Sequence, residues 1–489
     1  MKARSTGSTN CGFITLEILI AFTILILCIG AVIIVTFGNQ SGAINAEIDQ
    51  EALSKAQAVL EKARADAKFD FNLINPSTNL EVIQKDLFTK EVTSHNLSTT
   101  LTTLLTNPEA VDGGDTCSSV LTGDWKNPEM TSYEFGAELL SPSDSVNIFP
   151  IKDIDVNNHK LYAVIDNANS KTLPTFFKFD ITDSTMPPIF IDSMDNNPGV
   201  ESGFNAFTIV GHYAYLANAH GANYDTCVVS LSCSQLQVVN TDTMKVVGKL
   251  KIPSALGAGG QATGQSIFYK NGIVYLGLRK TTAGTEFNII DVGGGGSGGS
   301  PTNPIYLGGI NIGNWVNSIY IKDGYAYIAS PNNTELEIVD VSNSFSPSIT
   351  GQFDAPAGGG NNGNGKSLGL VGNVLYLGRT LLTGNEFYIL DKTDPATELP
   401  VLAELDIRNS SNNNTSVNGI IIRDFLIFLL TNSDLQILKL DTSYSLSHYR
   451  ASLPTPGGTG TSIDCEGNYI YFSSVPSNSK GFITITTAK

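Results

Sequence analysis

The stretch Ser318–Ser330, "SIYIKDGYAYIAS", decides the fold of this 489-residue chain. It consists of an apolar strand pattern, an Asp-Gly turn and a second strand pattern that carries an aromatic residue. Two such runs on either side of Asp-Gly are typical of a β-hairpin. A third strand pattern, "LEIVDV", follows at Leu336–Val341, and a fourth, "SITGQFD", follows at Ser348–Asp354. The stretch therefore predicts an antiparallel unit of four strands.

The same unit recurs along the chain with a period of about 50 residues. Further copies of the hairpin begin at Asp153, Phe207, Ser266, Ser367, Gly419 and Ser462. The second strand of each copy carries an aromatic residue, at Tyr162, Tyr215, Tyr275, Tyr327, Tyr376, Phe428 and Tyr471. Repeats of four strands at this period form β-propellers. The sequence therefore predicts an all-β propeller of seven blades at residues 132–489, and the "LEIVDV" pattern resembles the LVIVD-repeat family of propellers.

The seventh unit ends after three strands, with "GFITIT" at Gly481–Thr486. The stretch "SYEFGAELLSP", Ser132–Pro142, precedes the first unit and has the pattern of the other fourth strands. We expect strand 132–142 to pair with Gly481–Thr486 and to close the ring, because closure leaves no sheet edge open.

The N-terminus carries a different pattern. A short basic leader with Lys2 and Arg4 precedes "GFITLE", Gly12–Glu17, and an uncharged run follows at Ile18–Phe37. A run of about 20 apolar residues is long enough to cross a bilayer as a helix. We therefore expect a transmembrane half at 18–37 with the leader on the cytoplasmic side. The carboxylate of Glu17 at the edge of this run requires a partner, since burying a charge in hydrocarbon costs roughly 2.5–3.5 kcal/mol or more.

The leader, Gly12, Phe13, Glu17 and the apolar run together resemble the N-terminal signature of type IV prepilins. This resemblance implies cleavage after Gly12 by a prepilin peptidase and methylation of the new N-terminal Phe13. It also implies that Glu17 pairs with the N-terminal amine of a neighbouring pilin subunit during assembly. The expected localisation is the inner membrane, as a single-pass precursor, and then an extracellular pilus or the cell surface. An ordinary single-pass anchor is the alternative.

The helical pattern continues beyond the apolar run. Apolar or small residues recur at helical spacing at Ile44, Ile48, Ala52, Ala56, Leu60, Ala63 and Ala67. They predict an amphipathic extension of the helix to about Asn72. The expected domains are a leader at 1–12, a pilin-like helix at 13–72, a small pilin-like β segment and linker at 73–131, and the propeller at 132–489. The β segment is expected to hold two short strands, and an amphipathic helix at Leu80–Phe88 is its alternative.

Cysteine and ion-pair patterns suggest sites in the head. Cys227 and Cys233 are close enough in sequence to close a small disulfide loop, and the pairing of Cys117 with Cys465 is left open. Arg279 with Glu286, and Arg379 with Glu386, have the same spacing in two units. This spacing predicts cross-strand ion pairs, and the alternative is a binding face for carbohydrate that also includes the Cys227–Cys233 loop.

The composition limits the partners. The net charge of −17 and the pI of about 4.7 disfavour nucleic acid, because an acidic chain repels phosphate backbones. The five histidines are scattered, and no calcium loop or nucleophile motif appears, so we expect no catalytic residue, metal or cofactor. The expected function is a minor or tip pilin that displays a propeller to a glycan or protein on a surface, and not an enzyme. A membrane-anchored propeller enzyme and a pseudopilin for secretion or DNA uptake are the alternatives.

Overall fold

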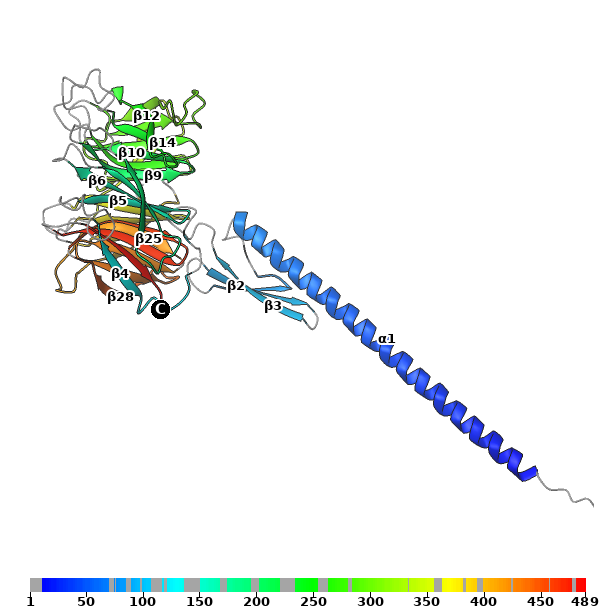
Figure 1. Cartoon of the computed structure of the whole chain (residues 1–489). Helices are drawn as coiled ribbons and strands as arrows, with labels where there is room; N and C mark the ends of the chain where they lie inside the picture. Colours follow the sequence, from blue (N-terminus) through cyan, green and yellow to red (C-terminus); the bar gives the residue numbers. More distant parts are fainter. Residues whose placement is uncertain are drawn as a thin grey trace, which may run out of the picture. The chain divides into compact units, whose positions relative to one another are not determined.

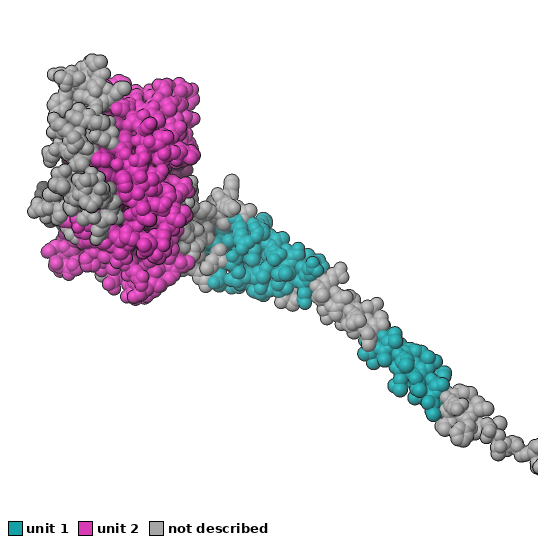
Figure 2. Space-filling model, in the orientation of Figure 1, with its two compact units in different colours: residues 1–85, 90–105 teal, residues 86–89, 106–489 magenta. Residues whose placement is uncertain are grey.

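The computed structural model describes residues 11–69, 74, 76–84, 89–96, 99–106, 117, 121–135, 150–167, 174–194, 202–219, 234–253, 263–279, 284–332, 334–355, 363–380, 384–393, 399–423, 425–456, 458–476 and 481–489. The chain divides into two compact units. The first unit contains residues 1–85 and 90–105, and the second contains residues 86–89 and 106–489 (Figure 2).

The first unit consists of one helix and a small sheet (Figure 1). Helix α1 runs from Cys11 to Phe69, and the antiparallel sheet has the order β1-β2-β3, with β1 at Leu80–Gln84, β2 at Thr89–Asn96 and β3 at Thr99–Thr106. The buried apolar side chains of this unit are Ala52, Ala56, Leu60, Ala63, Ile74, Leu80, Val92 and Leu105. The expected apolar stripe is thus confirmed at its four described positions in the C-terminal half of α1. The alternative prediction, an amphipathic helix at Leu80–Phe88, is wrong for Leu80–Gln84, because these residues form strand β1.

The expected membrane span is wrong. No helix in the described part of the chain is long and apolar enough to cross a membrane. The fold class with a transmembrane half at 18–37 must therefore be corrected, and the expected single-pass membrane localisation is contradicted with it. Outside α1, the regular structure of the described residues is in strands.

The second unit is a β-propeller of seven four-stranded blades (Figure 1). Each blade is antiparallel, and in the first six blades the strands follow one another in sequence from the inner to the outer edge. Blade 1 contains β5 (Ile151–Asn157), β6 (Lys160–Asn167), β7 (Phe176–Asp180) and β8 (Ile189–Met194). Blade 2 contains β9 (Ser202–Val210), β10 (Tyr213–Asn218), β11 (Leu236–Asn240) and β12 (Lys245–Leu250). Two further pairs between β6 and β9 join these blades into one sheet.

The remaining blades are separate four-stranded sheets. Blade 3 contains β13 (Gly264–Lys270), β14 (Ile273–Leu278), β15 (Phe287–Asp291) and β16 (Ile305–Ile310), and blade 4 contains β17 (Ser318–Lys322), β18 (Tyr325–Ala329), β19 (Leu336–Asp340) and β20 (Ser348–Phe353). Blade 5 contains β21 (Gly365–Val371), β22 (Val374–Arg379), β23 (Phe387–Asp391) and β24 (Val401–Leu405), and blade 6 contains β25 (Val417–Arg423), β26 (Leu426–Thr431), β27 (Asp434–Leu440) and β28 (Leu446–Pro454). Blade 7 contains β29 (Thr459–Glu466), β30 (Tyr469–Val475), β31 (Phe482–Thr487) and β4 (Glu129–Glu134).

The hydrophobic core of the head lies between neighbouring blades. One apolar cluster fills each boundary, from blades 1 and 2 round to blades 7 and 1. Every blade therefore buries both of its faces, which explains why the second strands are almost continuously apolar. The seven aromatic residues that define the repeat in the sequence are all buried in these clusters. The inner strands contact one another in order, and β29 contacts β5 to complete the ring.

The ring is closed by a strand from before the first blade, but this strand lies earlier than expected. Strand β4, Glu129–Glu134, pairs antiparallel with β31, and Thr484 lies opposite Ser132. Of the expected strand 132–142, residues 136–142 lie outside the described part of the chain. Residues 121–128, directly before β4, also pack in the head, because Trp125 is 2 % exposed and its ring lies 5.0 Å from that of Phe428.

Candidate functional site: the central channel

A cavity of about 600 Å³ lies among the inner strands of the propeller. Residues of β5, β9, β13 and β29 line it together with Tyr320 of β17. A smaller cavity of about 360 Å³ is lined by residues of β13 and β17 with Asp323 and Leu370. We refer to the larger cavity as the central channel. Its position on the inner edges of five blades makes it the candidate binding site of the head.

One wall of the channel carries three aspartates on the inner strands of blades 7 and 1. Each carboxylate accepts a hydrogen bond from a backbone N–H of the next blade. Phe207 N donates to Asp153 Oδ2 at 3.0 Å, and Ile209 N donates to Asp155 Oδ2 at 2.9 Å. Val156 N donates to Asp464 Oδ2, and Ser462 Oγ donates to Asp153 Oδ1 at 2.6 Å. The aspartates therefore connect the inner strands of blades 7, 1 and 2.

These carboxyl groups titrate at higher pH than ordinary aspartates. Burial raises the pKa of Asp153 to about 6. Burial raises the pKa of Asp155 to about 7, and the charge of Asp153 adds to this shift. The pKa of Asp464 is raised well above its usual value by burial and then by the charge of Asp155. Close carboxylates avoid being ionised together, so the group can hold a proton near neutral pH.

The opposite wall of the channel is aromatic. The rings of Phe268 and Tyr320 lie with their centroids 5.0 Å apart, one on β13 and one on β17. Lys270 follows on the same strand, and its Nζ donates to Ile321 O at 3.0 Å, so it links blades 3 and 4. Carboxylate acceptors on one side and ring faces on the other suit a ligand with hydroxyl or cationic groups.

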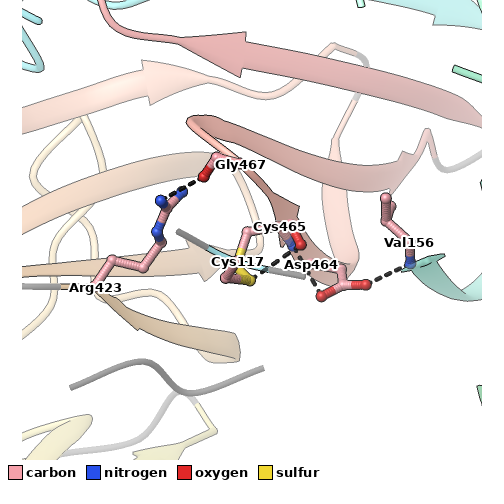
Figure 3. The surroundings of a disulfide bond; sticks show 6 residues. All are labelled: Cys117, Val156, Arg423, Asp464, Cys465 and Gly467. Atoms are coloured by element: carbon pink, nitrogen blue, oxygen red, sulfur yellow. Dashed lines mark hydrogen bonds between the residues drawn. A yellow bond between two sulfur atoms is a disulfide. The ribbon is translucent and has the colours of Figure 1, made fainter. Parts of the chain in front are cut away.

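A disulfide adjoins the acidic wall (Figure 3). Cys117 is bonded to Cys465, which follows Asp464 directly and is fully buried. This pairing was left open by the sequence, and the structure shows it. The bond joins the chain before β4 to the inner strand of blade 7. Nearby, Arg423 donates to Gly467 O in the next blade, so the same region is also connected to blade 6 (Figure 3).

The expected hairpin ion pairs do not form between the described residues. Arg379 instead pairs with Glu335 of the neighbouring blade, at 2.6 Å between Nη2 and Oε1. Arg279 donates from Nε to Gln265 Oε1 at 3.0 Å, and its guanidinium lies over the ring of Trp315 at 5.1 Å. Spacing within one hairpin suggested these pairs, but Arg379 contacts a glutamate of the adjacent blade and Arg279 contacts Gln265 on the inner strand of its own blade.

Glu286 and Glu386 are structural residues and not part of an exposed binding face. Both are buried directly before the third strand of a blade. Glu286 Oε2 accepts from Ile312 N at 2.9 Å, and Glu386 Oε2 accepts from Ile407 N at 2.9 Å. Each carboxylate thus satisfies the backbone N–H of the second residue after the fourth strand. Since Arg379 is buried as well, the expected binding face at these residues is wrong apart from the half-buried Arg279.

The side chains of the other predicted site residues lie outside the described part of the structure, so these predictions are not tested. Cys227 and Cys233 lie outside the described residues. Gly12, Phe13 and Glu17 lie in the first turns of α1, and their side chains also fall outside the description.

The channel aspartates were present in the quoted repeats but were not selected from the sequence. Asp155 and Asp464 occupy the place of Phe268 and Tyr320 in the inner strands of their blades. A charged residue at a position that is uncharged in the other copies is the signal that could have identified them.

Comparison with known proteins gives one family match and two structural likenesses. The LVIVD repeat matches residues 314–355, which contain blade 4. The search of curated proteins found no match. The crystal structure of the computationally designed Ika8 protein matches with 12 % identity and a TM-score of 0.44, over 67 % of this chain and 81 % of that chain. The extracellular domain of the hybrid two component system BT4673 from B. thetaiotaomicron matches with 11 % identity and a TM-score of 0.45, over 73 % of this chain and 40 % of that chain. The chain therefore contains a repeat-rich β-propeller with an LVIVD repeat in its fourth blade.

Proposed function

We propose that the chain is a minor or tip subunit of a type IV pilus-like filament that presents its propeller for adhesion or surface recognition. The supporting observation is the apolar surface of α1. Side chains from Leu19 to Ile34 are exposed around the helix, with exposed fractions of 67 % at Leu19, 67 % at Leu27 and 74 % at Ile34. Continuous apolar surface of this kind marks an interaction site.

The two halves of α1 differ in a way that fits helix assembly. In the C-terminal half, Ala52, Ala56, Leu60 and Ala63 are buried within the unit of the helix itself. The N-terminal half has no such cover among the described residues, so the proposed cover is the equivalent helix of other subunits. Glu17 would then pair with the N-terminal amine of a neighbour, since a carboxylate in an apolar bundle is tolerated when it is paired.

The head supplies the proposed recognition function. The central channel combines a wall of carboxylates with the aromatic pair Phe268 and Tyr320, which supports binding of a glycan or a protein side chain. The acidic character of the whole chain argues against nucleic acid as the ligand. A large head also suits a subunit present in few copies better than a densely packed major subunit.

Processing by a prepilin peptidase is tested by N-terminal sequencing of the mature protein. We expect the mature chain to start at Phe13, and we expect Gly12→Val to leave the leader attached. A mature protein that retains Met1, or that starts beyond Phe37, contradicts the proposal.

Assembly is tested with Glu17→Ala, and Glu51→Ala is the matched control. Glu51 is an exposed acid of the same helix, and among the described residues it pairs with Lys55, one turn away. We expect Glu17→Ala to reduce the amount of protein in sheared filaments and Glu51→Ala to leave it unchanged. Equal incorporation of Glu17→Ala and wild type contradicts the proposed assembly contact.

Recognition is tested by screening the full-length protein against glycans, surface protein fractions and duplex DNA. Saturable binding to a glycan or protein supports the adhesion function. Tight DNA binding that weakens with salt overturns it and favours a DNA-uptake pilin.

A further inference from the structure

The inner strands share an irregularity at one mouth of the channel. In six blades the pairing between the first and second strands shifts register by one residue near the start of the inner strand. The inserted residues are Lys152, Asn205, Gln265, Lys366, Asn418 and Thr461, and Asn317 occupies the equivalent place before β17. We call these seven residues the collar. A β-bulge re-aims the side chain of its extra residue and is common beside binding sites.

Asparagines in the even-numbered blades connect the collar. Asn205 Nδ2 donates to Gly264 O at 2.7 Å, and Asn317 Nδ2 donates to Gly365 O at 2.7 Å. Asn418 Nδ2 donates in the same way to Gly460 O at 2.8 Å. Each acceptor glycine directly precedes the collar residue of the next blade. Successive collar residues therefore lie side by side in these three pairs of blades.

The acceptor position requires glycine because the backbones approach closely. A Cβ added to Gly365 would lie 2.0 Å from Glu335 O, and one added to Gly264 would lie 2.8 Å from the Ala217 carbonyl carbon. The bridging asparagines and glycines are therefore structural. The collar residues of the odd-numbered blades, Lys152, Gln265, Lys366 and Thr461, have no such bridging role.

Three of these four residues have other partners. Gln265 Oε1 accepts from Arg279 Nε, and Thr461 shares a hydrogen bond with Ser473 at 2.7 Å. Lys152 Nζ lies 3.7 Å from Asp166 Oδ2. Lys366 forms no hydrogen bond or ion pair with the described residues.

The surroundings of Lys366 are unfavourable to its charge. Burial lowers the pKa of its ammonium group, and the charge of Lys152 lowers it further. The two lysines stand at equivalent positions on the inner strands of blades 1 and 5, on different sides of the ring. Lys366 is a half-buried ammonium group that forms no hydrogen bond or ion pair with the described residues, and a second lysine stands at the equivalent bulge of blade 1. An anion bound beside such a group stabilises its charge.

We propose that the collar binds a compact anionic group of a ligand, a carboxylate, sulfate or phosphate, with Lys366 Nζ as the principal contact and Lys152 Nζ as the second. The site does not depend on filament assembly, because the helix takes no part in it. It also differs from the acidic wall, whose carboxylates are turned toward the backbone N–H groups of blades 1 and 2. Asp166 offsets part of the charge of Lys152, so Lys366 supplies the larger share of the attraction.

The test is calorimetric titration of the full-length protein with acetate, inorganic sulfate and inorganic phosphate at matched ionic strength. The variants are Lys366→Met and Lys152→Met, and Lys245→Met on outer strand β12 is the control because Lys245 is exposed. We expect saturable binding of at least one anion and about a tenfold or greater loss of affinity in Lys366→Met, since a charged hydrogen bond is removed. A smaller loss is expected in Lys152→Met and none in Lys245→Met.

Two further measurements separate a binding role from a folding defect. Lys366→Arg retains the charge and should retain binding, and the thermal unfolding of every variant should be compared with that of wild type. NMR of the Lys366 ammonium group should show that the bound anion raises the pKa of Lys366. Absence of saturable binding for all three anions, or equal affinity in wild type and Lys366→Met, overturns the proposal. An equal loss in Lys245→Met also overturns it, because it would show a general charge effect.

Discussion

Arg379 and Glu335 form a buried ion pair across the boundary between blades 5 and 4, with 2.6 Å between Nη2 and Oε1. Their side chains are 4 % and 0 % exposed. The other carboxylate oxygen of Glu335 accepts from Ala355 N at 2.8 Å, and Arg379 Nη1 donates to Asn385 O at 2.8 Å. Each group also has a backbone partner in its own blade, and the pair connects the two sheets directly.

Removing one partner of this pair should destabilise the head. We expect Arg379→Met to lower the free energy of unfolding by roughly 3–5 kcal/mol, because Glu335 would remain buried without a counter-charge. Both tryptophans, Trp125 and Trp315, lie in the propeller, so urea unfolding followed by tryptophan fluorescence reports on the head. Adding Glu335→Gln to Arg379→Met should recover part of the loss.

The control for the buried pair is Arg408→Met. Arg408 pairs with Asp406, and the two side chains are 42 % and 36 % exposed. A surface pair contributes about 0–1 kcal/mol, so this variant should unfold close to wild type. Equal losses in Arg379→Met and Arg408→Met would contradict a special role for the buried pair.

Replacing Glu286 by glutamine should preserve the stability of the head, whereas replacing it by alanine should lower it. In blade 2 the equivalent residue is Gln235, whose Oε1 accepts from Ile252 N at 2.9 Å, as Glu286 does from Ile312 N. We expect Glu286→Ala to cost about 1–3 kcal/mol of unfolding free energy, because a buried backbone N–H loses its acceptor. Glu286→Gln should cost much less in the same urea experiment. The prediction fails if the alanine and glutamine variants are equally unstable.

The channel aspartates should make the stability of the head fall as pH rises. Their folded pKa values, about 6 for Asp153 and about 7 for Asp155, lie above the ordinary value of 3.8. Between about pH 4 and pH 7 the folded state therefore holds more protons than the unfolded state, and the free energy of unfolding decreases with pH. Above this window, the contribution of these groups is constant.

Asp155→Asn should remove part of this dependence. The amide oxygen can still accept from Ile209 N, but the side chain carries no charge. We expect the free energy of unfolding of the variant to match that of wild type near pH 4 and to exceed it by about 1–2 kcal/mol at pH 8. This difference is smaller than the full pKa shift implies, because solvent in the channel screens the charges. Urea unfolding across this range measures the difference. A variant with the same pH profile as wild type would contradict the prediction.

The disulfide should contribute to closure of the ring. Cys117 and Cys465 are 348 residues apart, so their bond restricts a long loop of the unfolded chain. We expect Cys117→Ser to lower the free energy of unfolding by about 2–5 kcal/mol. Reductant should destabilise wild type to a similar level and leave the variant unchanged. Cys28→Ser is the control, since Cys28 is a free, exposed residue of α1; the closure role fails if both variants match wild type.

The sequence by itself determined the repeat and the strand order of every blade. Each unit is defined by alternating apolar residues, turn residues and the aromatic residue of its second strand. These signals lie within about 25 residues of one another, so the local sequence pattern is sufficient to predict the strands. The same is true of the buried stripe at Ala52, Ala56, Leu60 and Ala63 of α1. The need for a closing strand also followed from the sequence, because the last unit contains only three strands.

Tertiary structure alone decided which residues meet between blades. Arg379 pairs with Glu335 and not with Glu386, and Asp464 binds the backbone of Val156, more than 300 residues earlier, since stacking of the sheets places them together. It also set the register of the closing strand at Glu129–Glu134 and joined Cys117 to Cys465. The collar is visible only in the folded ring, because seven residues spread over the sequence take equivalent positions when the inner strands surround one channel.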